Sequence, residues 1–229
     1  MNLFDVAMVA ADTSRTKHFI KKLIKSDLLP NYVLLLLNSN NKLLPGQTEI
    51  DSENELVALL KSASIEFEIA PSANINSDEA AKIIKSRLEQ VFIFSGYGGE
   101  LLKDKILDTG KKFLHIHGGY LPDYKGSTTN YYSLIDENTI GASAIFLTKE
   151  IDCGPILLRK KFSAPADRKA IDHNSDSEAR AKVLIECLQN YVNSGGWKYE
   201  LENNYGGETF YIIHPVLKHL AILGKEALQ

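Results

Sequence analysis

The sequence predicts an α/β fold, with a mostly parallel sheet and helices on both of its faces. Apolar segments of strand length alternate along the chain with amphipathic helical segments, which is typical of right-handed crossovers between parallel strands. Residues 32–37 (YVLLLL) are apolar on both faces, as strands covered on both sides are. Glycine-rich or polar loops follow several strands, and such loops lie at the sheet edge where ligands bind.

The first half of the chain contains strand-length apolar runs, most of them followed by a helix with a recognisable start. Residues 3–11 form the first expected strand, and the polar residues 12–14 cap a helix over about 14–27. Ser52 and Glu55 make a capping box for the next helix. The other expected elements are an Asn-rich loop to about 47, a helix to about 62, a strand at 67–70, a helix capped by Ser77 that buries Ala81, Ile84 and Leu88, a strand at 91–94 and a helix at about 100–108.

The second half continues this alternation until residue 194, where the character of the sequence changes. The expected elements are a strand at 113–117, a helix from Ser127 or Thr128 to about 135, strands at 142–147 and 156–162, a polar loop at 164–177 and a helix from Ser175 or Ser177 to about 193. After residue 194, aromatic residues around Gly206 and Gly207 predict a hairpin, and residues 215–223 a short helix. We therefore expect a large domain, 1–193, and a small C-terminal extension, 194–229.

Composition narrows the function classes. The chain has 229 residues, 44% of them hydrophobic, and its net charge of −3 gives no electrostatic basis for binding nucleic acid. Two widely separated cysteines, Cys153 and Cys187, are too few for a disulfide framework and favour reduced thiols. The longest apolar run, 33–37, is far shorter than the roughly 20 residues that span a bilayer, and residues 3–11 lack a basic leader. We expect a cytoplasmic protein without a membrane partner.

The candidate site centres on two histidines. Alternation along the strand at 113–117 places His115 and His117 on one face, and Gly118 and Gly119 let the chain turn sharply after them. Asp152 follows another strand, so the loops at 95–99, 118–126 and 148–155 converge at one sheet edge. An imidazole moves protons near neutral pH, a carboxylate orients it, and a second imidazole can donate a hydrogen bond to an oxyanion. This set suits acyl transfer to an amine.

Alternatives to this interpretation remain open from the residues alone. Each histidine can be a satisfied structural residue and Asp152 a turn residue, and convergence of the loops argues against both. A zinc site of His115, His117 and Asp152 is a minor alternative, because no further cluster of ligands lies near them. No dinucleotide fingerprint follows the first strand, and residues 125–128 have glycine and lysine in the wrong order for a phosphate loop.

Three motifs together resemble the N10-formyltetrahydrofolate-dependent formyltransferase family. They are His115-Ile116-His117, then Leu121-Pro122-Asp123-Tyr124-Lys125-Gly126, and then Asp152-Cys153-Gly154-Pro155, in the order and spacing of that family. The resemblance covers residues 90–160 well, and the N-terminal third agrees in architecture only. It implies a Rossmann-like formyltransferase fold, with 1–193 as the catalytic domain.

The resemblance also implies site residues. His117 and Asp152 match the family's catalytic histidine and aspartate, while His115 stands where the family usually has asparagine, as a bulkier and titratable donor. The implied folate-binding residues are Ser95, Gly96, Tyr97, Gly98, Gly99, Leu101, Leu102 and Ile151. The expected acceptor-binding residues are Tyr120, Lys125, Asn130 and Tyr132, and Tyr131 is a further aromatic that can pack on a sugar or base.

The resemblance implies direct formyl transfer from N10-formyltetrahydrofolate to a small-molecule amine, without a covalent enzyme intermediate or a metal. The tail at 207–215 is similar to those of bacterial sugar N-formyltransferases and favours a nucleotide-linked amino sugar from surface-glycan biosynthesis, with the pseudaminic-acid type as a weaker idea. A glycinamide ribonucleotide-type enzyme, another small-amine formyltransferase, a metal-dependent hydrolase and a non-catalytic member of the fold are the alternatives. The short tail and the acidic balance disfavour transfer RNA, and a homodimer is compatible with the sequence.

Overall fold

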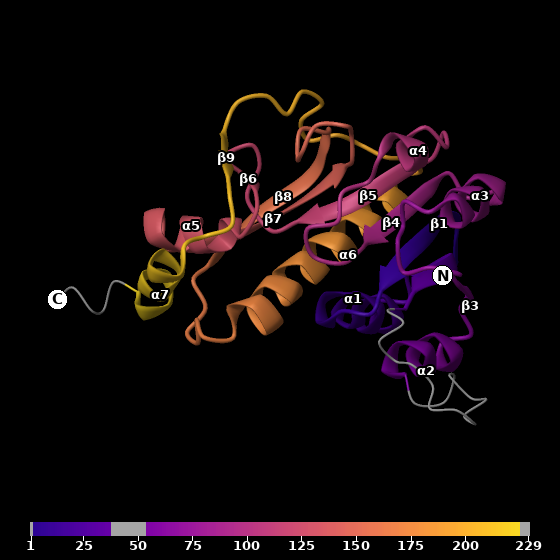
Figure 1. Ribbon diagram of the computed structural model, residues 1–229, viewed down its shortest axis with the longest axis horizontal. Helices are drawn as coiled ribbons and strands as arrows, with labels where there is room; N and C mark the ends of the chain where they lie inside the picture. Colours follow the sequence, from indigo (N-terminus) through magenta and orange to yellow (C-terminus); the bar gives the residue numbers. More distant parts are fainter. Residues whose placement is uncertain (1, 38–53, 225–229) are drawn as a thin grey trace. The chain divides into compact units, whose positions relative to one another are not determined.

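The computed structural model shown in Figure 1 describes residues 2–37 and 54–224. These residues divide between two compact units, with the boundary between Leu114 and His115. The Asn-rich loop expected up to residue 47 begins at 38 and, like Ser52, lies outside the described residues. A domain division at residue 194 stays a prediction. In the described ranges, no helix is long and apolar enough to cross a membrane.

The first unit holds a parallel sheet. Its strands are β1 (Asn2–Ala11), β2 (Leu29–Leu36), β3 (Glu66–Ile69) and β4 (Val91–Ser95). They lie in the order β3-β2-β1-β4, with parallel pairing throughout, and the start of β5 (Lys112–His117) follows β4. β1 is fully buried from Val6 to Ala11, as expected for a strand covered on both faces. The parallel α/β prediction is confirmed for this unit.

The helices of the first unit are α1 (Ser14–Lys25), α2 (Glu55–Ser62), α3 (Asp78–Ser86) and α4 (Asp104–Leu107). α1 packs with α2 and α3 with α4. The chain moves from β1 outward to β3 and then returns past β1 to β4, so right-handed crossovers put the two helix pairs on opposite faces.

Three local expectations for the first unit need correction. The residue that caps α2 is Asn54, whose side chain accepts hydrogen bonds from the amides of Leu56 and Val57. Leu88 is 89% exposed, because α3 ends at Ser86 and the helical periodicity stops before residue 88 is reached. The helix expected at about 100–108 is a single turn, α4. The Ser77 cap of α3 is confirmed.

The second unit packs α6 against an antiparallel pair of strands. In it the end of β5 lies next to β7 (Thr139–Phe146), and β7 pairs antiparallel with β8 (Ile156–Ser163). α6 (Asp176–Ser194) contacts both β7 and β8. Within the stretch expected to be a polar loop, residues Ile171–Ser175 form a π-helical turn that leads into α6.

The C-terminal segment does not form the expected hairpin. Its strand β9 (Glu208–Phe210) pairs in parallel with β6 (Tyr124–Gly126), so the two lie side by side in Figure 1. Two of the aromatic residues that suggested a hairpin pack on earlier elements instead: Trp197 stacks on Tyr191, and Phe210 on Tyr124. The segment therefore contributes to the loop after β5.

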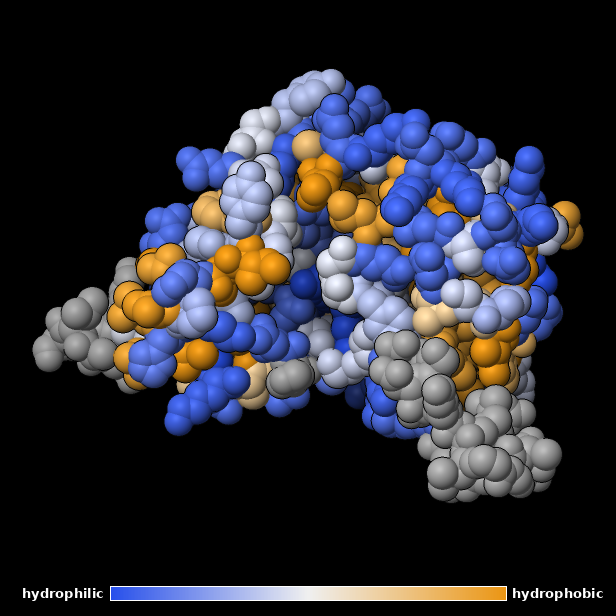
Figure 2. All heavy atoms as spheres, in the orientation of Figure 1, coloured by the Kyte–Doolittle hydropathy of each residue, from blue (hydrophilic) through white to orange (hydrophobic). Residues whose placement is uncertain are grey.

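The last helix, α7 (Pro215–Leu223), has the bounds expected from the sequence. It packs against α5 (Thr129–Asp136), which in turn contacts β7. The outward face of α7 is apolar, and orange side chains gather over it in Figure 2. The exposed residues of this face are Val216, Leu217, Leu220 and Leu223.

Candidate active site

β5 brings the two histidines to its carboxyl end. His117 is only 4% exposed, while His115, two residues earlier on the same face, is half-buried. The Nε2 atom of His117 lies 2.8 Å from the carbonyl oxygen of Tyr124, and its Nδ1 atom lies 3.4 Å from Oδ2 of Asp152. All three candidate catalytic residues belong to the second unit. The structure thus brings His117 and Asp152 together as the sequence suggests, whereas the catalytic roles stay predictions.

The carbonyl of Tyr124 fixes the tautomer of His117. A carbonyl oxygen only accepts hydrogen bonds, so Nε2 carries the proton and donates it. In the neutral ring, Nδ1 then holds the lone pair, and this lone pair faces the carboxylate of Asp152. A second proton on Nδ1 turns this repulsion into an ion pair. Nδ1 is therefore the atom of His117 at which a proton is gained and lost.

Burial and charge act in opposite directions on His117. Burial lowers its pKa below the usual value, because the charged ring loses solvation. The Asp152 carboxylate raises the pKa, the Arg180 guanidinium lowers it, and the carbonyl of Tyr124 and the carboxylate of Asp176 raise it. The net shift is downward, which keeps the ring neutral and able to accept a proton at physiological pH.

Asp152 is held in a strained turn between β7 and β8. Its φ of 52° is left-handed, which costs a residue with a side chain roughly 1–2 kcal/mol. Its carboxylate accepts a hydrogen bond from the amide of Gly126 at 2.8 Å. Gly154 lies so close to the carbonyl of Phe146 that no side chain fits there. These contacts fix the carboxylate next to Nδ1 of His117.

The two glycines after His117 are required by close packing. A Cβ atom on Gly119 would lie 2.6 Å from the oxygen of Tyr124 and 2.7 Å from Nε2 of His117. A Cβ atom on Gly118 would overlap the guanidinium of Arg180. Gly118 and Gly119 therefore let helix α6 and the Tyr124 carbonyl approach the His117 ring, which goes beyond the sharp turn expected from the sequence.

A polar network lies behind His117. Asp176 forms an ion pair with Arg180 at 2.8 Å, and its other oxygen accepts a hydrogen bond from Nδ2 of Asn130 at 2.7 Å. Arg180 also donates to the carbonyl of Ile116 at 2.9 Å. The spacing of Asp176 and Arg180, four residues apart on a helix, predicts an ion pair. It does not predict that the pair faces the protein interior, since such pairs usually lie on a solvated face.

Asn130, expected to bind the acceptor, has structural contacts at both ends of its amide. Besides its donation to Asp176, its Oδ1 atom accepts a hydrogen bond from the amide of Gly141 at 2.8 Å. The side chain is buried, and it ties α5 to both β7 and α6.

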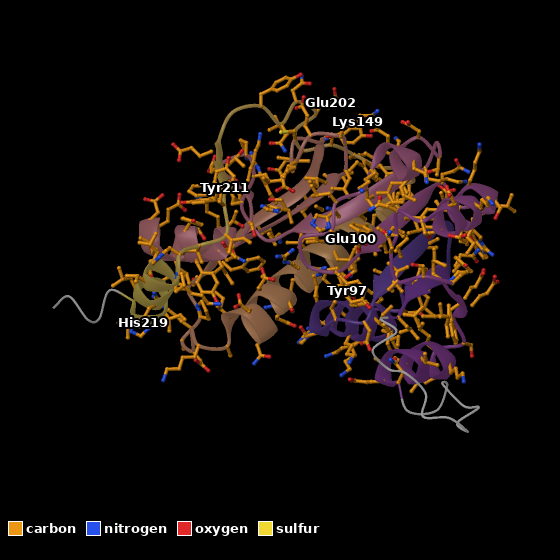
Figure 3. The ribbon with its side chains drawn as sticks, viewed as in Figure 1. Tyr97, Glu100, Lys149, Glu202, Tyr211 and His219 are labelled. Atoms are coloured by element: carbon orange, nitrogen blue, oxygen red, sulfur yellow. The ribbon has the colours of Figure 1, made fainter. Side chains whose placement is uncertain are left out.

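The other expected acceptor-binding residues also have contacts within the second unit. Nζ of Lys125 is buried and donates to the carbonyl of Asn204 at 2.9 Å. The hydroxyl of Tyr132 donates to the carbonyl of Tyr211, a residue that is 80% exposed and is labelled in Figure 3. The ring of Tyr120 contacts two cations, with Arg159 at 4.8 Å and Lys161 at 4.9 Å from its centre.

The expected folate-binding loop belongs to the first unit, except for Ile151, which is 49% exposed in the second. Ser95 is buried and shares a 2.8 Å hydrogen bond with the hydroxyl of Thr16. The hydroxyl of Tyr97 donates to the carbonyl of Leu36 at 3.0 Å, so the loop that Tyr97 marks in Figure 3 is anchored to β2.

Gly96 is buried against the ring of Phe94, and the loop is open only beyond Tyr97. Space surrounds Gly98 and Gly99, since a Cβ atom on either would meet nothing within 4 Å. Leu101 leaves 57% of its surface exposed, whereas Leu102 is half-buried. Exposed backbone next to an exposed apolar side chain suits a flat, partly apolar ring. Among the described residues, no group of three or more His, Cys, Asp or Glu side chains is placed to hold a metal ion.

The chain is similar to curated and solved formyltransferases. It is 27% identical over 118 residues to the methionyl-tRNA formyltransferase of Desulforamulus reducens, a match covering 50% of this chain and 37% of the relative. It is 15% identical to a sugar N-formyltransferase from Shewanella sp FDAARGOS_354, with a TM-score of 0.59 over 95% of this chain and 86% of that one. An N-formyltransferase from Helicobacter canadensis in complex with folinic acid and dTDP-3-aminofucose gives a TM-score of 0.58 at 15% identity, over 90% and 70% of the two chains.

These likenesses confirm the Rossmann-like formyltransferase fold. The chain spans little more than a third of the length of the curated relative it matches. The family model described as formyl transferase matches residues 6–186, which is most of the chain and includes the strand of His115 and His117 and the turn of Asp152. The chain therefore belongs to the formyl transferase family.

Proposed function

We propose that the chain transfers the formyl group of N10-formyltetrahydrofolate to the amine of a nucleotide-linked amino sugar. The observation that carries this proposal is the buried ring of His117, held between the Tyr124 carbonyl and the Asp152 carboxylate in a chain of the formyl transferase family. This arrangement gives one protonatable nitrogen, Nδ1, with a carboxylate to stabilise its charged state. Formyl transfer to an amine needs such a group, because the amine loses a proton as the new bond forms.

Each catalytic residue has one role in this proposal. N10-formyltetrahydrofolate is a substrate and supplies the activated formyl carbon, which the neutral amine attacks. His115 donates a hydrogen bond to the formyl oxygen as negative charge develops there. His117 receives the amine proton at Nδ1, directly or through a water, and passes it to the leaving nitrogen. Asp152 stabilises the charged ring between these two transfers.

Open space at Gly98 and Gly99 beside the exposed Leu101 supports folate binding to the first unit, since a flat ring can lie against this backbone. A solved neighbour in complex with folinic acid supports the same ligand class. Under this proposal, the protein works in the cytoplasm, and the homodimer stays a prediction.

The amino-sugar acceptor is supported by two solved neighbours named as acting on or binding sugars. Tyr120 lies beside Arg159 and Lys161, which also form ion pairs with Glu200 and Glu137, so an aromatic ring and cationic side chains are close together. Such a combination suits a sugar linked through phosphates. Transfer to methionyl-tRNA remains the competing acceptor, because the curated relatives carry that name.

The testing experiment has two steps. Calorimetric titration with folinic acid, with and without chelator, should give chelator-insensitive micromolar binding, about −8 kcal/mol. The protein is then incubated with N10-formyltetrahydrofolate and separate panels of dTDP- and UDP-linked amino sugars, glycinamide ribonucleotide and methionyl-tRNA. Mass spectrometry should detect formylation of an amino sugar. No folinic acid binding overturns formyl transfer, and formylation confined to another panel overturns the acceptor class.

A further inference from the structure

The C-terminal strap, which we define as residues 201–210, contacts both loops that carry the candidate site. Leu201 forms a bridge with Ile156, directly after the Asp152 turn. Residues 208–210 pair with β6, so that Lys125 lies opposite Thr209. Glu202 marks the strap in Figure 3, and Lys149 marks the start of the Asp152 turn. The strap therefore joins the two segments that hold the partners of His117.

Asn204 is the residue of the strap that reaches the Asp152 turn. It is 1% exposed, and its Nδ2 atom donates to the carbonyl oxygens of Asp152, at 2.6 Å, and of Gly154, at 3.1 Å. The main-chain carbonyl oxygen of Asn204 accepts a hydrogen bond from Nζ of Lys125 at 2.9 Å, and Lys125 is itself 4% exposed. The side-chain amide of Asn204 thus holds the Asp152 turn through two hydrogen bonds, and the buried ammonium group of Lys125 links the main chain of Asn204 to β6.

The Asp152 turn needs hydrogen bonds of this kind to keep its conformation. A left-handed residue with a side chain persists only where its surroundings hold it there. The amide of Gly126 holds the carboxylate of Asp152, but it does not satisfy the carbonyls of the turn. Asn204 supplies two donors to these buried carbonyls, and without them the turn can relax to an unstrained conformation. Relaxation would rotate the carboxylate of Asp152 away from Nδ1 of His117.

We propose that Asn204 is a positioning residue that keeps the Asp152 carboxylate at Nδ1 of His117. The expected effect of Asn204 on turnover rests on the proposed function. The expected effect of Asn204 on the His117 ring does not. The sequence had given no sign of it, because an asparagine in a polar, glycine-rich tail usually lies in an exposed turn. Its neighbour Asn203 is such an exposed asparagine and provides a matched control.

The first test reads the His117 ring itself. The side-chain nitrogens of isotope-labelled histidines are followed by NMR over a pH titration, and His117→Gln identifies the His117 signals. Four groups act on this ring besides its burial: Asp152, Arg180, Tyr124 and Asp176. If Asn204 holds Asp152 in place, Asn204→Ala should lower the pKa of His117 further, as Asp152→Asn should. Asn203→Ala should leave it unchanged. A wild-type titration curve in folded Asn204→Ala overturns the inference.

Two further variants separate positioning from simple loss of stability. Asn204→Leu has nearly the same shape and no charge but lacks the two donors, so a folded Asn204→Leu should reproduce the His117 shift. Leu201→Ala removes the packing of the strap on the cluster of Leu121, Ile145 and Ile156 without changing the donors of Asn204. This variant should lower the melting temperature while leaving the His117 titration in place. An equal His117 shift in Leu201→Ala would mean that any damage to the strap suffices, which overturns a specific role of Asn204.

The turnover test applies once a formylated acceptor is known. Asn204→Ala should reduce kcat by about 10²-fold, the loss expected from a misplacement of about 1 Å, with KM for the formyl donor nearly unchanged. A shifted His117 titration without any formylated acceptor would leave Asn204 as the positioning residue and refute the proposed function instead. Unchanged kcat together with an unchanged titration refutes the positioning role.

Discussion

The ring of His117 donates from Nε2 to the carbonyl of Tyr124, and this bond directs Nδ1 toward the carboxylate of Asp152, 3.4 Å away. One backbone carbonyl therefore decides which nitrogen of the ring moves protons. The carbonyl can come so close because Gly119 has no side chain. The geometry around His117 thus depends on backbone positions in the loop at 118–126 as much as on the side chain of Asp152.

The lowered pKa of His117 predicts a loss of stability in acid. The unfolded chain binds a proton near pH 6.5 that the buried ring binds only at lower pH. The stability contribution is therefore fully present above about pH 6.5 and is lost as the pH falls toward the folded-state pKa. Urea denaturation at about pH 7.5 and pH 5.5 should show a smaller pH-dependent loss in His117→Gln than in the wild type. An identical loss in both proteins would contradict a buried neutral His117.

His115 is expected to act as a hydrogen-bond donor to the formyl oxygen, which can be tested by substituting this residue. His115→Ala should reduce kcat by about 10²–10³-fold, equivalent to about 3–4 kcal/mol, as loss of an oxyanion donor does. His115→Asn keeps a donor of the type the family usually has at this place and should retain substantial activity. Initial rates of formyl transfer measure both variants. Equal rates in His115→Ala and the wild type would remove His115 from the site, and a gain from no activity in His115→Asn would identify a non-catalytic member of the fold.

Local signals made much of the fold predictable. The limits of α7 follow from Pro215 at its start and Gly224 at its end, and Ser77 announces α3 by its capping side chain. The partner of β9 was not predictable, because parallel pairing with β6 joins residues more than eighty positions apart. Aromatic residues near two glycines fit a hairpin equally well, and only the tertiary packing of Phe210 on Tyr124 decides between them.

The residues of the site with reactive side chains could be predicted from their motifs. The residues that hold them in place through buried contacts could not. His117 and Asp152 could be identified by residue type and spacing, and the structure brings them together. Asn130 was expected to bind the acceptor, and this stays a prediction. Its side-chain amide forms hydrogen bonds with Asp176 and Gly141, and a sequence does not reveal which polar groups have such buried partners.

Gly119→Ala should damage both stability and activity. The added methyl group would press on the Tyr124 carbonyl and on Nε2 of His117, and such overpacking costs about 1–3 kcal/mol. Gly196→Ala is a matched control, because a Cβ atom there meets nothing within 4 Å. Thermal unfolding and urea midpoints measure both variants. A Gly119→Ala protein as stable and active as Gly196→Ala would show that the loop shifts freely and that its close packing has no role.

The charge of Arg180 should lower the pKa of His117. Its guanidinium lowers that pKa and also pairs with Asp176, whose carboxylate raises it. In Arg180→Ala the direct repulsion disappears and Asp176 loses its ion-pair partner. Both changes favour the charged ring, so the pKa of His117 should rise. Histidine NMR titration measures the shift, and Lys182→Ala, with an exposed side chain on the same helix, should leave the pKa in place. A lowered or unchanged His117 pKa in folded Arg180→Ala would mean that burial alone, without the charges of α6, keeps the ring neutral.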